Sequence, residues 1–298
     1  MANFFKFKLL KLGVILLSVV LAITISQFIA SSKGKLPANC EPHQHPVTFG
    51  LSDNFQGYTL QLPKNHSSEI SNSKIVRFSI LDSKQKSLSR FKVIHEKEIH
   101  AFIVGDNFSY FYHLHPVFKD GYWQSIIPQG VTGSPNFIVD FTLLGNRNNT
   151  VLGKQLTLPG ITQPKTLPTP SDLITDKSFN YRFFGGISSS SSTSLVVNIT
   201  DLDGNVVKLE KYLGVLGHAI SFNISSNKYY HFHSMSEKSM MECPAHSLAI
   251  VDRWLTADAN SGNIHLMGDV KDAGLYLVYL QFKSKNGIHT LPFTINVS

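Results

Sequence analysis

The sequence predicts an all-β protein in which two tandem immunoglobulin-like β-sandwich domains follow an N-terminal signal or anchor segment. After residue 35, short apolar runs alternate with clusters of Gly, Asn, Ser and Asp, and long helical periodicity is absent. Phenylalanine, which suits strands better than helices, occurs 21 times. A histidine motif at His100 recurs at His218, and this offset of 118 residues is about the length of one sandwich domain.

The first 32 residues are typical of an export signal. Residues 1–11 are short and basic, residues 12–25 are uncharged and almost wholly apolar, and residues 30–32 (Ala-Ser-Ser) offer a cleavage site. The uncharged stretch over 12–30 is also long enough to span a bilayer, so an uncleaved inner-membrane anchor is the alternative. In either case we expect the bulk of the chain outside the cytoplasm, in the periplasm or secreted.

The apolar runs predict the strands and the boundaries between domains. They lie at 73–82, 100–107, 136–145, 194–204 and 274–282, each bounded by turn-forming residues. Four prolines within 159–172 predict an extended linker. We therefore expect, after the signal, an exported N-terminal segment at 33–57, a first sandwich at 58–160, a proline-rich linker at 161–178 and a second sandwich at 179–298.

The charge and the cysteines exclude two classes of protein. The formal net charge is +7, but three lysines stand in the first eleven residues and the others are scattered. A nucleic-acid binder concentrates basic residues in a patch, so we expect no nucleic-acid partner. Two cysteines, Cys40 and Cys243, are too few for a disulfide framework. Both a single bridge between them and two unpaired thiols remain open.

Each predicted sandwich carries the same histidine triad, with the spacing H-x12-H-x-H. The first triad is His100, His113 and His115, and the second is His218, His231 and His233. An aromatic pair precedes the H-x-H in both, and the polar strand sequences at 78–88 and 197–209 also match. Repetition of three histidines at one spacing indicates a duplicated site rather than chance.

Hairpin geometry places the first triad on one face of a sheet. A two-residue turn at 106–107 (Asp-Asn) would set His100 directly opposite His113. His115 lies two residues further along the same strand and therefore faces the same side. The same register makes Glu98 the partner of His115. Three converging imidazoles are good ligands for a transition metal, so we expect copper or, as a less favoured choice, zinc.

The second repeat allows the equivalent pairing of His218 with His231 around a longer turn at 223–226, with Leu216 in the place of Glu98. The two metal sites therefore need not be equivalent. Strand parity points His95 away from the triad unless a bulge intervenes, and we keep it as a further candidate ligand.

Soft ligands follow the second triad. Met240, Met241, Cys243 and His246 lie within a few residues of one another, and thioether and thiolate groups select Cu(I). The alternative is a flexible loop with gap-filling methionines.

The segments at 95–123 and 211–234 resemble a group of bacterial exported proteins. Those proteins carry HEK-x-x-H…H-x-HP followed by DG-x-W, and then YLG-x-x-GH…H-x-HP. The resemblance implies copper or heavy-metal handling by His95, His100, His113, His115, His218, His231 and His233. This chain departs from the pattern at Ser234, where proline is usual, and 235–246 looks like an insertion.

Three functions are compatible with these features. The favoured one is a metal-binding protein of the cell envelope that chaperones, buffers or detoxifies copper, with an envelope protein as a further partner. The second is a metal-free adhesive or scaffold protein, which predicts that the histidines do not cluster. The third is a metalloenzyme, in which Glu98 or Glu96 would act as base. Because nucleophile elbow, H-E-x-x-H and phosphate loop are all absent from the sequence, we favour a binding protein over an enzyme.

Overall fold

Strands dominate the computed structural model, and every described strand pair is antiparallel. The model describes residues 52–63, 67–70, 73–146, 149–163, 165–189, 193–234, 259–268, 270 and 272–298. All of them fall within one compact unit, Pro42–Ser298. The predicted all-β class is confirmed. Within these ranges no helix has the length and apolar character that a membrane crossing requires.

Several predictions from the sequence concern residues outside the described ranges. These are the signal or anchor segment at 1–32, most of the segment at 33–57, both cysteines, and the soft ligands Met240, Met241, Cys243 and His246.

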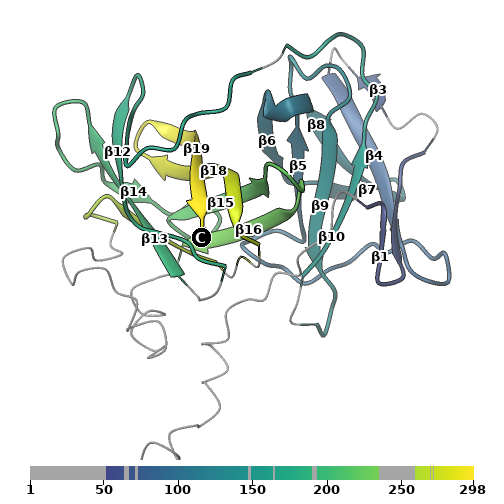
Figure 1. Cartoon of the computed structure of the whole chain (residues 1–298). Helices are drawn as coiled ribbons and strands as arrows, with labels where there is room; N and C mark the ends of the chain where they lie inside the picture. Colours follow the sequence, from purple (N-terminus) through teal and green to yellow (C-terminus); the bar gives the residue numbers. More distant parts are fainter. Residues whose placement is uncertain are drawn as a thin grey trace, which may run out of the picture. The chain divides into compact units, whose positions relative to one another are not determined.

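The first sandwich consists of two sheets with the strand orders β1-β2-β4-β8-β7 and β10-β9-β5-β6, and β3 pairs with β4 (Figure 1). Its strands are β1 (Asn54–Phe55), β2 (Tyr58–Gln61), β3 (Ser67–Ile70), β4 (Ser73–Leu81), β5 (Ile99–Val104), β6 (Phe111–Leu114), β7 (Val117–Lys119), β8 (Tyr122–Ile127), β9 (Asn136–Thr142) and β10 (Asn149–Gln155). Alternate side chains of both sheets, among them Phe78, Trp123, Ile103 and Phe137, form its core.

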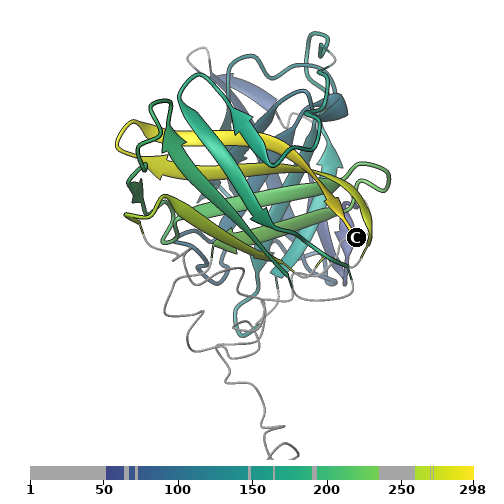
Figure 2. The same ribbon diagram turned by 60° about the vertical axis from the view of Figure 1, so that its left-hand side comes forward.

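The second sandwich is a continuous sheet that folds over on itself, and Figure 2 brings it forward. Its strands are β11 (Leu173–Thr175), β12 (Phe179–Gly185), β13 (Thr193–Asp201), β14 (Leu209–Glu210), β15 (Gly217–Asn223), β16 (Tyr229–Ser234), β17 (Asn263–Gly268), β18 (Gly274–Ser284) and β19 (Gly287–Val297). Tyr181 and Val197 on one half pack with Val278 and Phe293 on the other. Strand β11 lies inside the range 161–178, all of which the proline pattern assigned to the linker.

The two sandwiches share a topology, so the sequence repeat is also a structural repeat. The order β19-β18-β15-β16 reproduces β10-β9-β5-β6, and β12-β13-β17 reproduces β2-β4-β8. The matching segments at 78–88 and 197–209 form the same turn. Asp82 Oδ1 accepts hydrogen bonds from the backbone N–H groups of Lys84 and Lys86, and Asp201 Oδ1 does so from Asp203 and Asn205.

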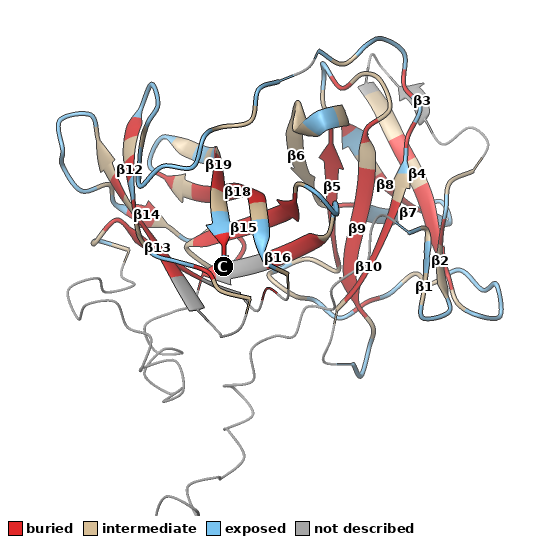
Figure 3. Ribbon diagram, in the orientation of Figure 1, coloured by how far each residue is buried: buried red, intermediate tan, exposed pale blue. Residues whose placement is uncertain are grey.

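A third apolar cluster joins the two repeats. Side chains on the outer faces of the equivalent sheets form it, including Phe102 and Ile138 from the first repeat and Ile220 and Leu277 from the second. Because this cluster covers the outer faces, β5 and β15 are buried at every position instead of at alternate ones (Figure 3). A strand with both faces covered has no solvent side. Polar side chains on these outer faces are therefore buried between the repeats.

Candidate metal centre

The hairpin of β5 and β6 differs from the predicted register by two residues. Phe102 lies opposite His113, and Ala101 opposite Leu114. The predicted pairing of His100 with His113 is therefore wrong. A shift of two residues leaves each side chain on its original face. The three histidines of the first triad consequently still share the outer face.

A longer turn causes this shift. Gly105 N donates to Tyr110 O, so four residues separate the two ends of the turn rather than two. A short 3₁₀ segment, Asp106–Phe108, fills the turn, and Asn107 adopts a left-handed conformation with φ of 53°. Asparagine tolerates this conformation well, so its presence predicts a turn at this place. It does not set the number of residues in the turn.

The first triad brings three nitrogen donors together. One ring nitrogen from each of His100, His113 and His115 lies within 4.8 Å of the other two. Nδ1 of His100 is 3.0 Å from Nε2 of His113. His100 itself is 4% exposed, whereas His113 and His115 are half-buried.

The second hairpin shows the same kind of departure. Ile220 lies opposite His231, and the backbone of His218 lies opposite that of His233, so the predicted pairing of His218 with His231 is also wrong. The side chains of His218 and His231 share one face and are almost completely buried. Their ring centres are 6.1 Å apart. The side chain of His233 lies outside the described part of the structure.

Described histidines of both triads converge on a single cluster. Sequence reasoning expected two separate sites, one in each repeat. The outer faces of the equivalent hairpins pack together, however, and the ring centre of His100 lies 6.2 Å from that of His218 and 5.9 Å from that of His231. His113 is 6.0 Å from His218 by the same measure. Among the described residues, five imidazoles thus surround one region; we call these residues (His100, His113, His115, His218 and His231) the histidine centre.

His95 borders the histidine centre. It is part of a tight turn rather than of a strand, with φ of 47°, so the parity argument does not apply to it. Its ring centre lies 5.1 Å from that of His218 and 6.4 Å from that of His100.

The carboxylate of Glu98 is bound by groups outside the histidine centre. Its Oε1 accepts a hydrogen bond of 3.0 Å from the backbone N–H of Phe91 and one of 3.3 Å from Nε of Arg90. It is not among the groups whose donor atoms meet in the first triad.

Backbone carbonyl groups orient one histidine from each repeat. Nε2 of His100 is 3.0 Å from the carbonyl oxygen of Ile94, and Nε2 of His218 is 3.1 Å from that of Tyr212. Both carbonyls begin equivalent tight turns. Since a carbonyl only accepts, Nε2 carries the proton in both rings, and Nδ1 is left as the basic nitrogen. Metal-bound histidines commonly hold their second ring nitrogen in this way.

Side chains from the opposite repeat orient two further histidines. Nδ1 of His113 is 2.9 Å from Oε1 of Gln281, and Nδ1 of His231 is 3.0 Å from Oδ2 of Asp140. Asp140 pairs with His100 across β9 and β5, and Gln281 pairs with His218 across β18 and β15. The two acceptors thus occupy equivalent positions. Each repeat holds a histidine of the other.

These hydrogen bonds leave lone pairs in close opposition. Gln281 Nε2 donates to Thr290 Oγ1, so Oε1 is the atom that accepts the proton of His113 Nδ1. The nitrogens of His100 and His113 that face each other are then both unprotonated at 3.0 Å. Two lone pairs at this distance repel each other unless a cation lies between them. In addition, Nε2 of His115 is buried and has no hydrogen-bond partner among the described residues.

Burial keeps the imidazoles neutral. Desolvation, and after it the neighbouring histidines, lowers the pKa of His113 well below its usual value. Desolvation lowers the pKa of His115 to about 4 and that of His218 to about 2, and it also lowers the pKa of His100. At neutral pH these rings therefore present lone pairs rather than protons.

Asp140 and Gln281 were not among the residues predicted from the sequence. Each is separated from the histidine it binds by scores of residues, so no spacing motif contains them. A signal was nevertheless present. Both interrupt otherwise apolar strands, Asp140 in NFIVDFT and Gln281 in GLYLVYLQF, where a buried polar side chain needs a partner.

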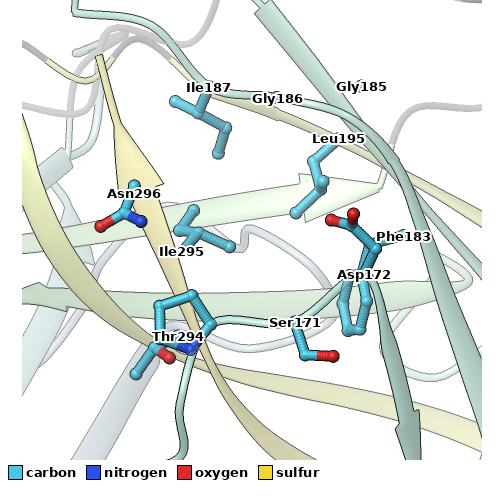
Figure 4. Close-up of a pocket in the computed structure, with 11 residues that line it drawn as sticks. Ser171, Asp172, Phe183, Gly185, Gly186, Ile187, Leu195, Thr294, Ile295 and Asn296 are labelled. Carbon is cyan, nitrogen blue, oxygen red and sulfur yellow. The ribbon is translucent and has the colours of Figure 1, made fainter.

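A hollow of about 290 Å³ lies at the edge of the second sandwich, away from the histidines (Figure 4). The linker residues Ser171 and Asp172 line it together with Phe183, Leu195 and Ile295. Asp172 is the one ionisable side chain among the residues that line it. This hollow shares no residue with the histidine centre. The group of metal-ligand atoms that lie close together in the described residues belongs to that centre.

Comparisons with known proteins give one family match, which covers the second repeat. A family model with the description Domain of unknown function (DUF8832) matches residues 175–298, which hold β12 to β19. A search of curated proteins found no match. The sheets themselves define the class of protein: an all-β chain with two tandem immunoglobulin-like sandwiches.

Solved structures show weak similarity to this chain. The D00-D0 domain of Intimin is 9% identical over 81% of this chain and 99% of that one, with a TM-score of 0.20. A chimeric titin Z1Z2 is 11% identical over 81% and 96%, with a TM-score of 0.19. MtrC from Shewanella baltica OS185 is 6% identical over 82% and 69%, with a TM-score of 0.24. Similarities at this level carry no argument about function.

Proposed function

We propose that this protein binds a transition-metal ion, copper by preference and zinc as the alternative, at the histidine centre between its two repeats. The observation that carries the proposal is the set of three imidazole nitrogens within 4.8 Å of one another, one from buried His100 and two from half-buried His113 and His115. Imidazole is a ligand for both metals, and the order of divalent affinities favours copper. The neutral state of the rings leaves these nitrogens available for coordination.

The distances support coordination after small side-chain movements. Nitrogens at about 2.0–2.1 Å from a tetrahedral ion are about 3.3 Å from each other. The nitrogens of His100 and His113 are 3.0 Å apart, and the third donor, from His115, lies within 4.8 Å of both. The orientation of four rings by acceptors outside the cluster supports the same conclusion, because such outer partners are usual around metal-bound histidines.

The clustering favours metal binding over the metal-free scaffold, which predicts dispersed histidines. Burial in turn favours holding an ion over catalysis, because a substrate would have to reach donors such as His218 and His231, which are 1% and 3% exposed. Together with the predicted export signal and the resemblance to exported proteins with HEK-x-x-H motifs, these features support a role outside the cytoplasm in copper buffering or resistance.

The test is metal binding by the chain from residue 33 onward. Affinities for Cu(I), Cu(II) and Zn(II) would be measured by competition with chelators, and bound metal by elemental analysis. We expect one tight equivalent, since the donors form a single cluster. The variant H113A/H115A should lose it, and so should H218A/H231A. The control H289A should not, because His289 lies apart, against Phe179 and Phe282.

Two outcomes would count against the proposal. Binding no tighter than that of an exposed histidine tag would make the cluster structural. Two equivalents, of which each double variant removes only one, would mean independent sites and would contradict the composite centre.

A further inference from the structure

The equivalent positions that orient His231 and His113 differ in charge. Asp140 stands on β9 in the first repeat, and Gln281 stands on β18 in the second. Both are buried, at 5% and 8% exposure, and both bind a ring nitrogen of a histidine in the opposite repeat. One acceptor is a carboxylate and the other an amide, so the two halves of the histidine centre are not electrostatically equivalent.

Asp140 is held as an acceptor on both of its oxygens. Oδ2 receives hydrogen bonds from Nδ1 of His231 at 3.0 Å and from the hydroxyl of Tyr229 at 3.1 Å. Oδ1 receives one of 2.8 Å from Nδ2 of Asn149. In these three contacts the carboxylate of Asp140 serves as the acceptor.

Gln281 offers the same hydrogen bond without the charge. Its Oε1 accepts from Nδ1 of His113 at 2.9 Å, and its Nε2 donates to Oγ1 of Thr290 at 3.0 Å. It therefore orients His113 but adds no negative potential. A carboxylate bound to one nitrogen of an imidazole makes the other nitrogen a stronger donor, whereas an amide does so less.

Building on the proposed metal-binding function, we propose that Asp140 is a positioning residue that makes the centre prefer a divalent ion, Cu(II) or Zn(II), over Cu(I). It does so through His231, whose donor strength it raises, and through its own charge. At a given distance a carboxylate attracts a divalent ion twice as strongly as a monovalent one. The soft ligands that would favour Cu(I), Met240, Met241 and Cys243, lie outside the described residues.

The experiment compares affinities for Zn(II), Cu(II) and Cu(I) in the wild type, D140N, Q281E and the double variant D140N/Q281E. In D140N the affinity for the divalent ions should fall about 10- to 100-fold, the usual effect of losing an outer partner of a metal-bound histidine. The affinity for Cu(I) should fall much less. Q281E should shift the ratio of Zn(II) to Cu(I) affinity the other way. The double variant, which moves the charge to the other repeat, should restore most of the ratio.

A structural role alone would lower the affinities for all three ions together and leave their ratio unchanged. An unchanged ratio in D140N, with tight binding by the wild type, would overturn this inference and leave the proposed function intact. Absence of binding by the wild type would overturn both. If D140N does not fold, Q281E decides, because an unchanged ratio in that variant contradicts the role of charge.

Discussion

Oε1 of Gln281, in the second sandwich, accepts a 2.9 Å hydrogen bond from Nδ1 of His113, in the first. His231 and Asp140 form the reciprocal bond from the second repeat to the first. Each repeat therefore supplies an acceptor for the first H-x-H histidine of the other repeat. The centre depends on contact between the two sandwiches, and four predictions follow from this dependence and from the burial that accompanies it.

Replacing Gln281 by leucine should weaken a site whose ligands all remain in place. Nδ1 of His113 would lose its acceptor, and the free energy of unfolding should fall by about 1–3 kcal/mol, the cost of a buried unpaired donor. Metal affinity should fall about 10- to 100-fold. Urea unfolding and chelator competition measure these two effects. T290A is the control, since Thr290 contacts Gln281 but not the histidine, and an equal loss of affinity in that variant would contradict the prediction.

Acid should destabilise the metal-free protein. The pKa values of His115 and His218 in the folded state, about 4 and about 2, lie below the 6.5 of the unfolded chain. The unfolded state therefore binds more protons below pH 6.5, so this part of the stability is fully present above that pH and is lost as the pH falls toward the folded values. The slope is at most about 1.4 kcal/mol per pH unit for each histidine that stays neutral.

Denaturant unfolding at pH 7.5, 6.0 and 5.0 measures this slope. The variant H218N should flatten it, because asparagine does not titrate. A free energy of unfolding that stays constant from pH 7.5 to 5.0 would contradict the neutral, buried state of the histidines.

Loss of apolar contact between the repeats should also reduce metal affinity. Phe102 is fully buried in the cluster that joins the two sandwiches, and F102A should cost about 3–5 kcal/mol. It should also increase hydrogen exchange in β15, which belongs to the other sandwich. The neighbouring Ile103 faces the core of the first sandwich, so I103A should destabilise that domain without exposing β15 first. Equal exchange in β15 for both variants would mean that Phe102 does not hold the repeats together.

His95 should contribute less than the triad. It lies at φ of 47° in a tight turn, a conformation that asparagine accepts, so H95N removes the imidazole without straining the backbone. We expect a change in metal affinity of less than about tenfold and no change in stability. H100N should instead abolish tight binding. A loss in H95N as large as that in H100N would make His95 a ligand.

The sequence by itself determined the fold class, the duplication and the shared face of the first triad. The last of these survived a wrong register. His113 was predicted opposite His100 and lies opposite Phe102, but side chains alternate along a strand with a period of two, so an even shift does not move them to the other face. Local periodicity and the H-x12-H-x-H spacing are properties of neighbouring residues, and these a sequence shows directly.

Only the tertiary structure decided that histidines of both repeats meet in one centre. That outcome depends on the packing of β5 and β6 against β15 and β16, which brings together side chains that are more than a hundred residues apart, such as His100 and His218. The tertiary structure also decided which residues orient the ligand histidines, because Asp140 and Gln281 bind histidines of the opposite repeat. Sheet packing is driven by burial of apolar area, which is not directional, so the strand pattern alone does not say which outer faces will meet.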